Sequence, residues 1–360
     1  MLRSRLLLTS SFLYIASASA YQASAPAERS TAAGVDANST VTLYVVANDK
    51  SGNPISGLHE QDFAVRENKQ PQKIASFQAS NATETAVPEI VLILDTVNTS
   101  FTRVAYARNQ IDKFLRQDAG RLAHPVSIAV FTDAGMDRPS APSQDGNALA
   151  EYLDKRETGL RSIRRSEGFY GASDRAQLSL RSLGQLAEYE EGRSGRKLVV
   201  WISPGWPLLS GPNVQLSTKN QQSVFDSIVA MSTQIRRARM TLYSVDPLGT
   251  AGSGNLRTFY YTEFLKGITT PKQVAFGDLS LQVFVVHSGG RVLNASNDVA
   301  GEVEKCVRDA NSYYSLSYNA APADGPNEYR AIEVKITGPS QAKAQTLAGY
   351  YAQTAGSGRR

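Results

Sequence analysis

The sequence predicts an α/β protein with a doubly wound sheet and flanking helices, joined to a small β-sandwich. Two patterns lead to this prediction. Between residues 85 and 311, short apolar runs alternate with stretches of helical periodicity, which is typical of a parallel sheet covered by helices on both faces. Outside that range apolar and polar residues alternate at a period of two, which is typical of strands with one buried face.

The first apolar run of the α/β part, residues 90–94, is expected to form its central strand. The run is unbroken and too short for a helix, so it indicates a strand buried on both faces. It ends in Asp95, and Asn98 and Thr99 follow shortly after. Ligands of open α/β sheets bind beyond the carboxyl ends of the strands. This loop is therefore the expected place of a site.

The alternation continues through the α/β part. Further strands are expected at 126–131, 197–202, 240–245 and 289–293. Helices are expected where apolar residues recur at helical spacing, at 104–115, 147–156, 174–186, 224–239, 279–287 and 298–307.

Both ends of the chain are expected to consist of strands, three after residue 39 and three before residue 352. Three short strands are not stable alone, so the two groups are predicted to share one sandwich with the α/β part inserted between them. The expected domains are the N-terminal strands at 39–84 (an Ig-like half), the α/β domain at 85–311, the C-terminal strands at 312–352 and a tail at 353–360.

The first 38 residues predict export. Residues 1–20 have the positive start, apolar stretch and small-residue cleavage site of a signal peptide, and a flexible leader is expected at 21–38. The apolar stretch is short for a bilayer span, although a retained membrane anchor is the alternative. Cys306 is the only cysteine, so no intramolecular disulfide can form. We expect a secreted, periplasmic or cell-envelope protein with no stable membrane span after signal removal.

The charge balance gives no reason to expect nucleic-acid binding. The formal net charge is +5, and two of the positive charges lie in the expected signal peptide. Without those two charges the surplus is 5 − 2 = +3, which is mild.

Several short motifs, taken in this order, resemble the secreted bacterial VWFA-related family, whose central domain is of the von Willebrand factor A type. They are GLHEQDF at 57–63, LDTVNT at 94–99, GRK at 195–197 before a strand with Trp201, YSVDP at 243–247, SYYSLSY at 312–318 and GYYA at 349–352. The resemblance covers nearly all of residues 39–352. It implies a Rossmann-like α/β domain and no known catalytic activity.

The resemblance also implies where a cation would bind. Domains of the von Willebrand factor A type often hold a divalent cation through Asp-x-Ser-x-Ser, a Thr of a second loop and a later Asp. Here the motif becomes Asp95, Val97 and Thr99, and Pro204 stands near the later Asp position. Asp95 and Thr99 are usable metal ligands, whereas Val97 and Pro204 offer no side-chain oxygen. We expect no resident cofactor and at most weak Mg²⁺ or Ca²⁺ binding at a degenerate site. The alternative is that Asp95 accepts backbone N–H bonds from the following turn.

No pattern in the sequence indicates catalysis. None of the three histidines stands beside a recognisable nucleophile, and no glycine-rich phosphate loop is present. Asp95, Asp133 and Asp246 each end a predicted strand, where catalytic carboxylates occur. Loop-start residues that accept backbone N–H bonds explain the same pattern.

Two hypotheses of function follow. The first is a non-catalytic protein-interaction module, an adhesion or scaffold protein, that binds an unidentified protein partner at the carboxyl edge of the sheet. Its expected contact residues are Asp95, Asn98, Thr99, Ser203 and Trp206. Trp206 is expected at an exposed loop tip, because aromatic residues there are favoured in interfaces; folding back over the helix is the alternative. The second hypothesis is a metal-dependent hydrolase that uses the strand-end carboxylates.

Overall fold

The computed structural model describes residues 40–80, 87–156, 168–207, 215–249, 261–337 and 342–354. The expected signal peptide at 1–20 and leader at 21–38 lie outside the described residues. Among the helices in the described ranges, none has both the length and the apolar character that a membrane crossing requires.

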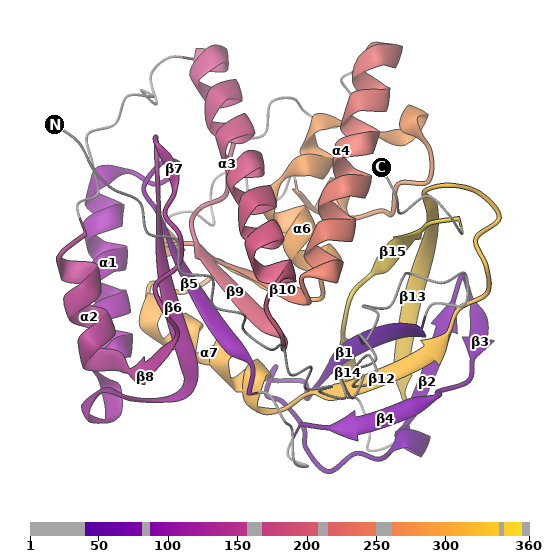
Figure 1. Cartoon of the computed structure of the whole chain (residues 1–360), viewed down its shortest axis with the longest axis horizontal. Helices are drawn as coiled ribbons and strands as arrows, with labels where there is room; N and C mark the ends of the chain where they lie inside the picture. The colour runs from indigo at the N-terminus through magenta and orange to yellow at the C-terminus, as the bar shows by residue number, and fades with distance from the viewer. Residues whose placement is uncertain are drawn as a thin grey trace, which may run out of the picture. The chain divides into compact units, whose positions relative to one another are not determined.

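A seven-stranded sheet forms the centre of the α/β part (Figure 1). Its strands lie in the order β11-β10-β9-β5-β6-β7, and β8 also pairs with β6. β5, β6, β9, β10 and β11 are parallel, and β7 and β8 run antiparallel to β6. The strands are β5 (Glu89–Asp95), β6 (Arg121–Thr132), β7 (Gly135–Met136), β8 (Ser143–Asp145), β9 (Lys197–Ile202), β10 (Met240–Val245) and β11 (Val292–Leu293). With β5 as the first strand, this is the 3-2-1-4-5-6 order of doubly wound sheets. β5 therefore lies where the winding reverses, with Asp95 at its carboxyl end.

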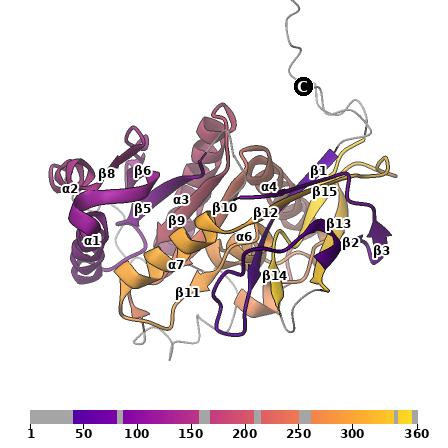
Figure 2. The same cartoon turned by 90° about the horizontal axis from the view of Figure 1, so that it is seen from below.

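Helices cover both faces of this sheet (Figures 1 and 2). One face packs against α1 (Phe101–Leu115), α2 (Gly146–Asp154) and α7 (Val299–Asn311). The other packs against α3 (Gly168–Glu191), α4 (Thr218–Arg237) and α6 (Leu281–His287). Five short 3₁₀ helices are also described: η1 (Glu60–Asp62), η2 (Gln117–Gly120), η4 (Tyr261–Phe264), η5 (Pro271–Gln273) and η6 (Phe276–Leu279).

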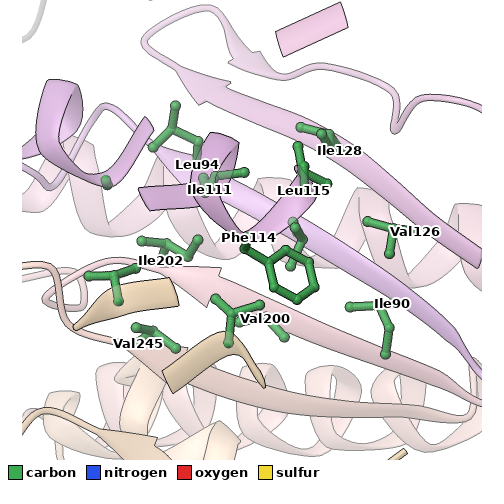
Figure 3. Close-up of a cluster of buried hydrophobic side chains, with 14 of the residues drawn as sticks. Ile90, Leu94, Ile111, Phe114, Leu115, Val126, Ile128, Val200, Ile202 and Val245 are labelled. Atoms are coloured by element: carbon green, nitrogen blue, oxygen red, sulfur yellow. The ribbon is translucent and has the colours of Figure 1, made fainter. Parts of the chain in front are cut away.

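β5 divides the core of the α/β part in two. Ile90, Leu92 and Leu94 point into the cluster under α1, shown in Figure 3, and Val91 and Ile93 point into the cluster under α3. All five side chains are fully buried. Burying one such side chain stabilises a fold by about 1.5–3 kcal/mol, so the unbroken apolar run is what keeps the strand at the centre.

Some boundaries differ from the sequence prediction. The helix expected from residue 174 begins earlier, at Gly168, and places Phe169 and Tyr170 in its first turn. The helix expected from 279 begins at Leu281, because η6 takes up the preceding residues. The short edge strands β7 and β8 were not predicted, since two or three residues are too few to show a period.

Strands from the two ends of the chain pair directly, and in the described residues each end contributes four strands where three were expected. β1 pairs with β12 in one four-stranded antiparallel sheet, and β2 pairs with β13 in another. The strands are β1 (Thr40–Asn48), β2 (Phe63–Glu67), β3 (Gln70–Gln72), β4 (Ser76–Ala79), β12 (Tyr314–Asn319), β13 (Glu328–Ile336), β14 (Lys343–Gln345) and β15 (Gly349–Ala352). Apolar residues of both sheets belong to one buried cluster. We refer to these two sheets as the paired sheets.

A buried polar network links the paired sheets. Arg330 of β13 donates to Glu67 of β2 at 3.1 Å, and both side chains are nearly fully buried. The other carboxylate oxygen of Glu67 accepts from the hydroxyls of Tyr318 (2.5 Å) and Tyr350 (2.8 Å). The network thus ties N-terminal Glu67 to three C-terminal strands. Because an unpaired buried charge is costly, neither half of the chain is expected to keep this arrangement alone.

Asp278, in η6, predicts a pH effect on stability. It is 4% exposed, and burial raises its pKa to about 6. A raised pKa in the folded state means that the contribution of Asp278 to stability is greatest below its unfolded pKa, near 4, and is lost as the pH rises through 6.

The variant Asp278→Asn tests this effect. It keeps an acceptor for the N–H of Ala275, which donates to Asp278 Oδ2 in the wild type. We expect the variant to match the wild type near pH 3.5 and to be more stable by about 1–3 kcal/mol at pH 7. Urea unfolding of both proteins between pH 3.5 and 7 measures this, and a difference that does not change with pH would contradict it.

Candidate functional site

The loop after β5 is built around the carboxyl group of Asp95, which is fully buried. Asp95 Oδ1 accepts the backbone N–H groups of Val97 (2.9 Å) and Asn98 (2.8 Å). A side chain that bonds the backbone two residues on forms an Asx turn. The turn brings the chain out of the strand and toward Ser100, the N-cap of α1.

The second oxygen of Asp95 is held by two side chains from different parts of the chain. Asp95 Oδ2 accepts from the amide of Asn98 at 2.9 Å and from the indole N–H of Trp201, in β9, at 3.1 Å. A side-chain hydrogen bond joins Ser203 to the same carboxyl group. Burial raises the pKa of Asp95, and these hydrogen bonds oppose the rise because they favour the ionised form. The carboxyl group is therefore enclosed by donors.

Asn98 extends this network to α3. Its amide also donates to the hydroxyl of Ser179 at 3.0 Å, and Ser179 donates to the carbonyl of Arg175 at 2.7 Å. Asn98, Ser179 and the adjacent Thr99 are all buried. Hydrogen bonds thus connect this loop and the end of β5 to the neighbouring strand β9 and to α3.

Trp206 is 4% exposed, so the expectation that it stands at an exposed loop tip is wrong. Its indole N–H donates to the carbonyl of Leu279 at 2.6 Å. Its ring packs edge to face with the ring of Trp201, and the two ring centres are 5.5 Å apart. Gly205 makes this possible. It has a φ of 86°, and a Cβ there would lie 2.3 Å from Gln282 Nε2. The turn at Gly205 folds the loop back and buries the indole against the sheet.

The residues at the carboxyl edge do not fit a divalent cation. A hard cation needs oxygen ligands, whereas Asp95 faces the N–H groups of Asn98 and Trp201. Val97 is buried in the apolar cluster with Trp201 and Trp206, and the carbonyl of Pro204 accepts from Gln282. Within the described ranges, no group of three or more His, Cys, Asp and Glu side chains could hold a metal ion. Asp95 and Thr99, the two expected ligands, are therefore not accompanied by the further oxygen ligands that a cation site requires.

This mismatch predicts that divalent cations do not stabilise the protein. We expect the melting temperature in 5 mM Mg²⁺ or Ca²⁺ to stay within about 1 °C of the value in EDTA, because stabilisation by a ligand grows only with saturation of its site. Differential scanning calorimetry at constant ionic strength measures this. A loss of several degrees in EDTA would show that a cation site exists and that Asp95 turns toward it.

The structure brings most of the expected contact residues together but buries them. Asp95, Asn98 and Ser203 belong to one hydrogen-bonded group, and Trp206 packs on Trp201 next to it. Asp95, Asn98, Thr99, Ser203 and Trp206 are each at most 4% exposed. A partner could touch these side chains only after the loops moved. In the structure as described they act as supports of the edge.

The other strand-end carboxylates are more accessible than Asp95. Asp133 and Asp246 are both partly exposed, and Asp246 Oδ1 accepts the N–H of Leu248 at 2.8 Å. This hydrogen bond to the backbone two residues further on is typical of an Asp residue at the start of a loop. A hydrolase that relied on Asp95 would need an accessible carboxylate, and Asp95 is enclosed.

The large apolar side chains that this edge exposes are aromatic. Phe101, the first residue of α1, is 72% exposed, and Phe169 and Tyr170, in the first turn of α3, are 61% and 81% exposed. The rings of Phe169 and Tyr170 pack edge to face, with their centres 6.2 Å apart. The remaining large apolar side chain that the described residues expose is Val87, before the amino end of β5.

Sequence reasoning missed these three aromatic residues. Phe101, Phe169 and Tyr170 all lie before the helices expected at 104–115 and 174–186. The available signal was the position of each residue: an aromatic at the very start of a helix that follows a parallel strand lies at the carboxyl edge of the sheet. Whether it is exposed depends on what packs over it, and the sequence pattern does not show that.

Comparison with known proteins adds little to this description. No family model and no curated protein matches the sequence. Among solved structures, the pilus adhesin SpaC from Lactobacillus rhamnosus GG is similar with a TM-score of 0.34 and 8% sequence identity. The match covers 86% of this chain and 49% of the adhesin, so the chain spans about half the length of that protein.

Proposed function

We propose that this protein is an exported, non-catalytic protein-interaction module of the von Willebrand factor A type, with an adhesion or scaffold role. It binds a protein partner at the carboxyl edge of its central sheet. The observation that carries the proposal is the exposure of Phe101, Phe169 and Tyr170 at that edge. Aromatic residues are enriched in protein interfaces and supply much of their binding energy.

The geometry of α3 supports contact with a large partner. Ser179, which bonds to the loop of Asp95, lies ten residues after Phe169. At 1.5 Å per residue the first turn of α3 therefore extends about 15 Å beyond that contact. Figure 1 shows α3 continuing past the ends of the strands. An aromatic pair on a projecting helix end suits a protein surface better than a small molecule.

The enclosed carboxyl group of Asp95 supports the same function. Phe101 follows the loop that Asp95 holds through bonds to Val97, Asn98 and Trp201. A contact residue on a rigid support loses little conformational entropy on binding, which favours affinity. The same enclosure favours a binding role over a hydrolytic one, because Asp95 has no free oxygen to activate water.

The test removes the three aromatic rings together, as Phe101→Ser, Phe169→Ser and Tyr170→Ser. The wild-type protein is immobilised, envelope proteins of the producing cell are captured on it, and the captured partner is then titrated against each variant. We expect the triple variant to bind the partner at least about tenfold more weakly, since interface aromatics of this kind often contribute 2 kcal/mol or more each.

Val87→Ser is the matched control. Val87 is 55% exposed but lies near the amino end of β5, on the opposite edge of the sheet. We expect this variant to bind like the wild type. Equal binding by the triple variant and the wild type would contradict the proposal, and so would metal-dependent hydrolysis that Asp95→Ala abolishes.

A further inference from the structure

A cavity of about 60 Å³ lies between the α/β part and the paired sheets. One water needs about 10–15 Å³ on this scale, so the cavity has room for a small molecule. The α/β part contributes the last turns of α4 and α6 and the start of β10, and the paired sheets contribute residues of β1, β13 and β15. α4 also packs directly against β15.

Most of the cavity wall is apolar or aromatic. The rings of Tyr329 and Tyr351 lie 5.2 Å apart, edge to face, and Ile235, Phe284 and Leu347 complete the apolar wall. The hydroxyl of Tyr351 is turned away, since it donates to the carbonyl of Ile268 at 3.0 Å. Walls of this kind, with a few polar groups, are typical of small-molecule sites.

Two arginine side chains, Arg236 and Arg239, also line the cavity, and their guanidinium groups differ in their partners. Arg239 donates to the carbonyls of Gly195 and Arg193. The guanidinium of Arg236 lies over the ring of Tyr350, with 5.1 Å between its central carbon and the ring centre, and its side chain makes no hydrogen bond or ion pair with any described residue. No Asp or Glu occurs among the described residues that line the cavity.

Among the described residues, no acidic side chain forms an ion pair with Arg236. Burial lowers the pKa of Arg236 because it removes the cation from water, and Tyr350 and Tyr318 only partly oppose this shift. The C-terminal pole of α4 lies nearby, and two of its carbonyls already accept hydrogen bonds: Gln234 O from the N–H of Ala238 (2.9 Å) and Arg236 O from the N–H of Arg239 (3.0 Å). His287 adds no charge, because burial lowers its pKa as well.

We propose that this cavity binds a small organic carboxylate. The guanidinium edge of Arg236 donates two parallel hydrogen bonds to the carboxylate, the geometry that arginine favours. A short apolar tail then lies against Tyr329, Tyr351 and Phe284. Inorganic anions lack the tail, and neutral molecules lack the charge that Arg236 requires.

The test uses butyrate as the probe on the full-length protein. Saturation-transfer difference NMR follows the titration of butyrate, of its neutral analogue butyramide, and of butyrate in competition with inorganic phosphate. A ligand of this size with one ion pair is expected to bind with a Kd on the order of a millimolar. Butyramide is expected to show no saturable binding, and phosphate is expected not to displace butyrate.

Two variants of adjacent residues place the site. Arg236→Met keeps the length of the side chain and removes its charge, and we expect it to weaken butyrate binding at least about tenfold. Arg237→Met is the control, because the Arg237 side chain is 55% exposed and pairs with Glu191 at 2.9 Å; its Kd is expected to stay within about twofold.

Circular dichroism confirms that both variants fold, and if Arg236→Met does not, Arg236→Lys replaces it, with weaker binding expected. The proposal is overturned if butyrate shows no saturable binding to the wild type, if the Arg236 variant binds like the wild type, or if phosphate competes equally well. The last result would identify a site for inorganic anions.

Discussion

Replacing Arg330 with Met is expected to lower the free energy of unfolding by about 3–5 kcal/mol. The side chain of Arg330 is 4% exposed and that of Glu67 is 8% exposed. Removing the guanidinium leaves the Glu67 carboxylate buried with only the hydroxyls of Tyr318 and Tyr350, and breaking a buried pair from one side has a cost of this size. Urea unfolding followed by circular dichroism measures it.

Two further variants separate the charge from the packing. Glu67→Gln with Arg330→Met removes both charges and keeps an acceptor for the tyrosines, so we expect it to be more stable than Arg330→Met alone. Arg66→Met is the surface control, since Arg66 and Glu333 are about half exposed and 3.9 Å apart; a change below about 0.5 kcal/mol is expected. A loss below 1 kcal/mol for Arg330→Met would show that the network contributes little.

Asp95→Ala is expected to destabilise the protein by about 3–5 kcal/mol. The substitution removes the acceptor of the N–H groups of Val97, Asn98 and Trp201, and each buried donor left without a partner costs about 1–3 kcal/mol. The expected loss is smaller than the sum of these three costs, because the variant no longer has to bury a carboxylate. Because Phe101 follows this loop, partner binding is expected to weaken as well.

Asp133→Ala is the control for this experiment. Asp133 follows the neighbouring strand β6 but is partly exposed, so we expect a loss of no more than about 1 kcal/mol. Guanidinium unfolding of the two variants gives the comparison. If Asp95→Ala were as stable as Asp133→Ala, the hydrogen bonds around Asp95 would not hold the loop.

Much of the fold could be read from local patterns. The apolar run of β5 predicted a strand buried on both faces, and all of its residues are buried. Period two at both chain ends predicted strands that share sheets, and β1 pairs with β12. These predictions worked because burial on a strand or helix repeats with the geometry of that element, and the repeat is visible in the order of the residues.

The surroundings of each site residue could not be read in this way. The sequence placed Asp95 at the end of a strand, but one of the two donors on its second oxygen is Trp201, which lies 106 residues further on. The same applies to Trp206, which folds back because Gly205 turns the chain next to Gln282. Contacts between distant residues depend on how the elements pack, and single-sequence periodicity carries no record of them.

The sequence by itself determined the type of sheet, the place of its central strand and the polar loop that follows it. The tertiary structure decided what that loop does: it encloses Asp95 with N–H donors, buries Trp206 and leaves Phe101, Phe169 and Tyr170 exposed. The physical reason is that periodicity follows from the geometry of one element. The partner of a buried carboxylate, and the exposure of a ring, depend on which other elements lie against it.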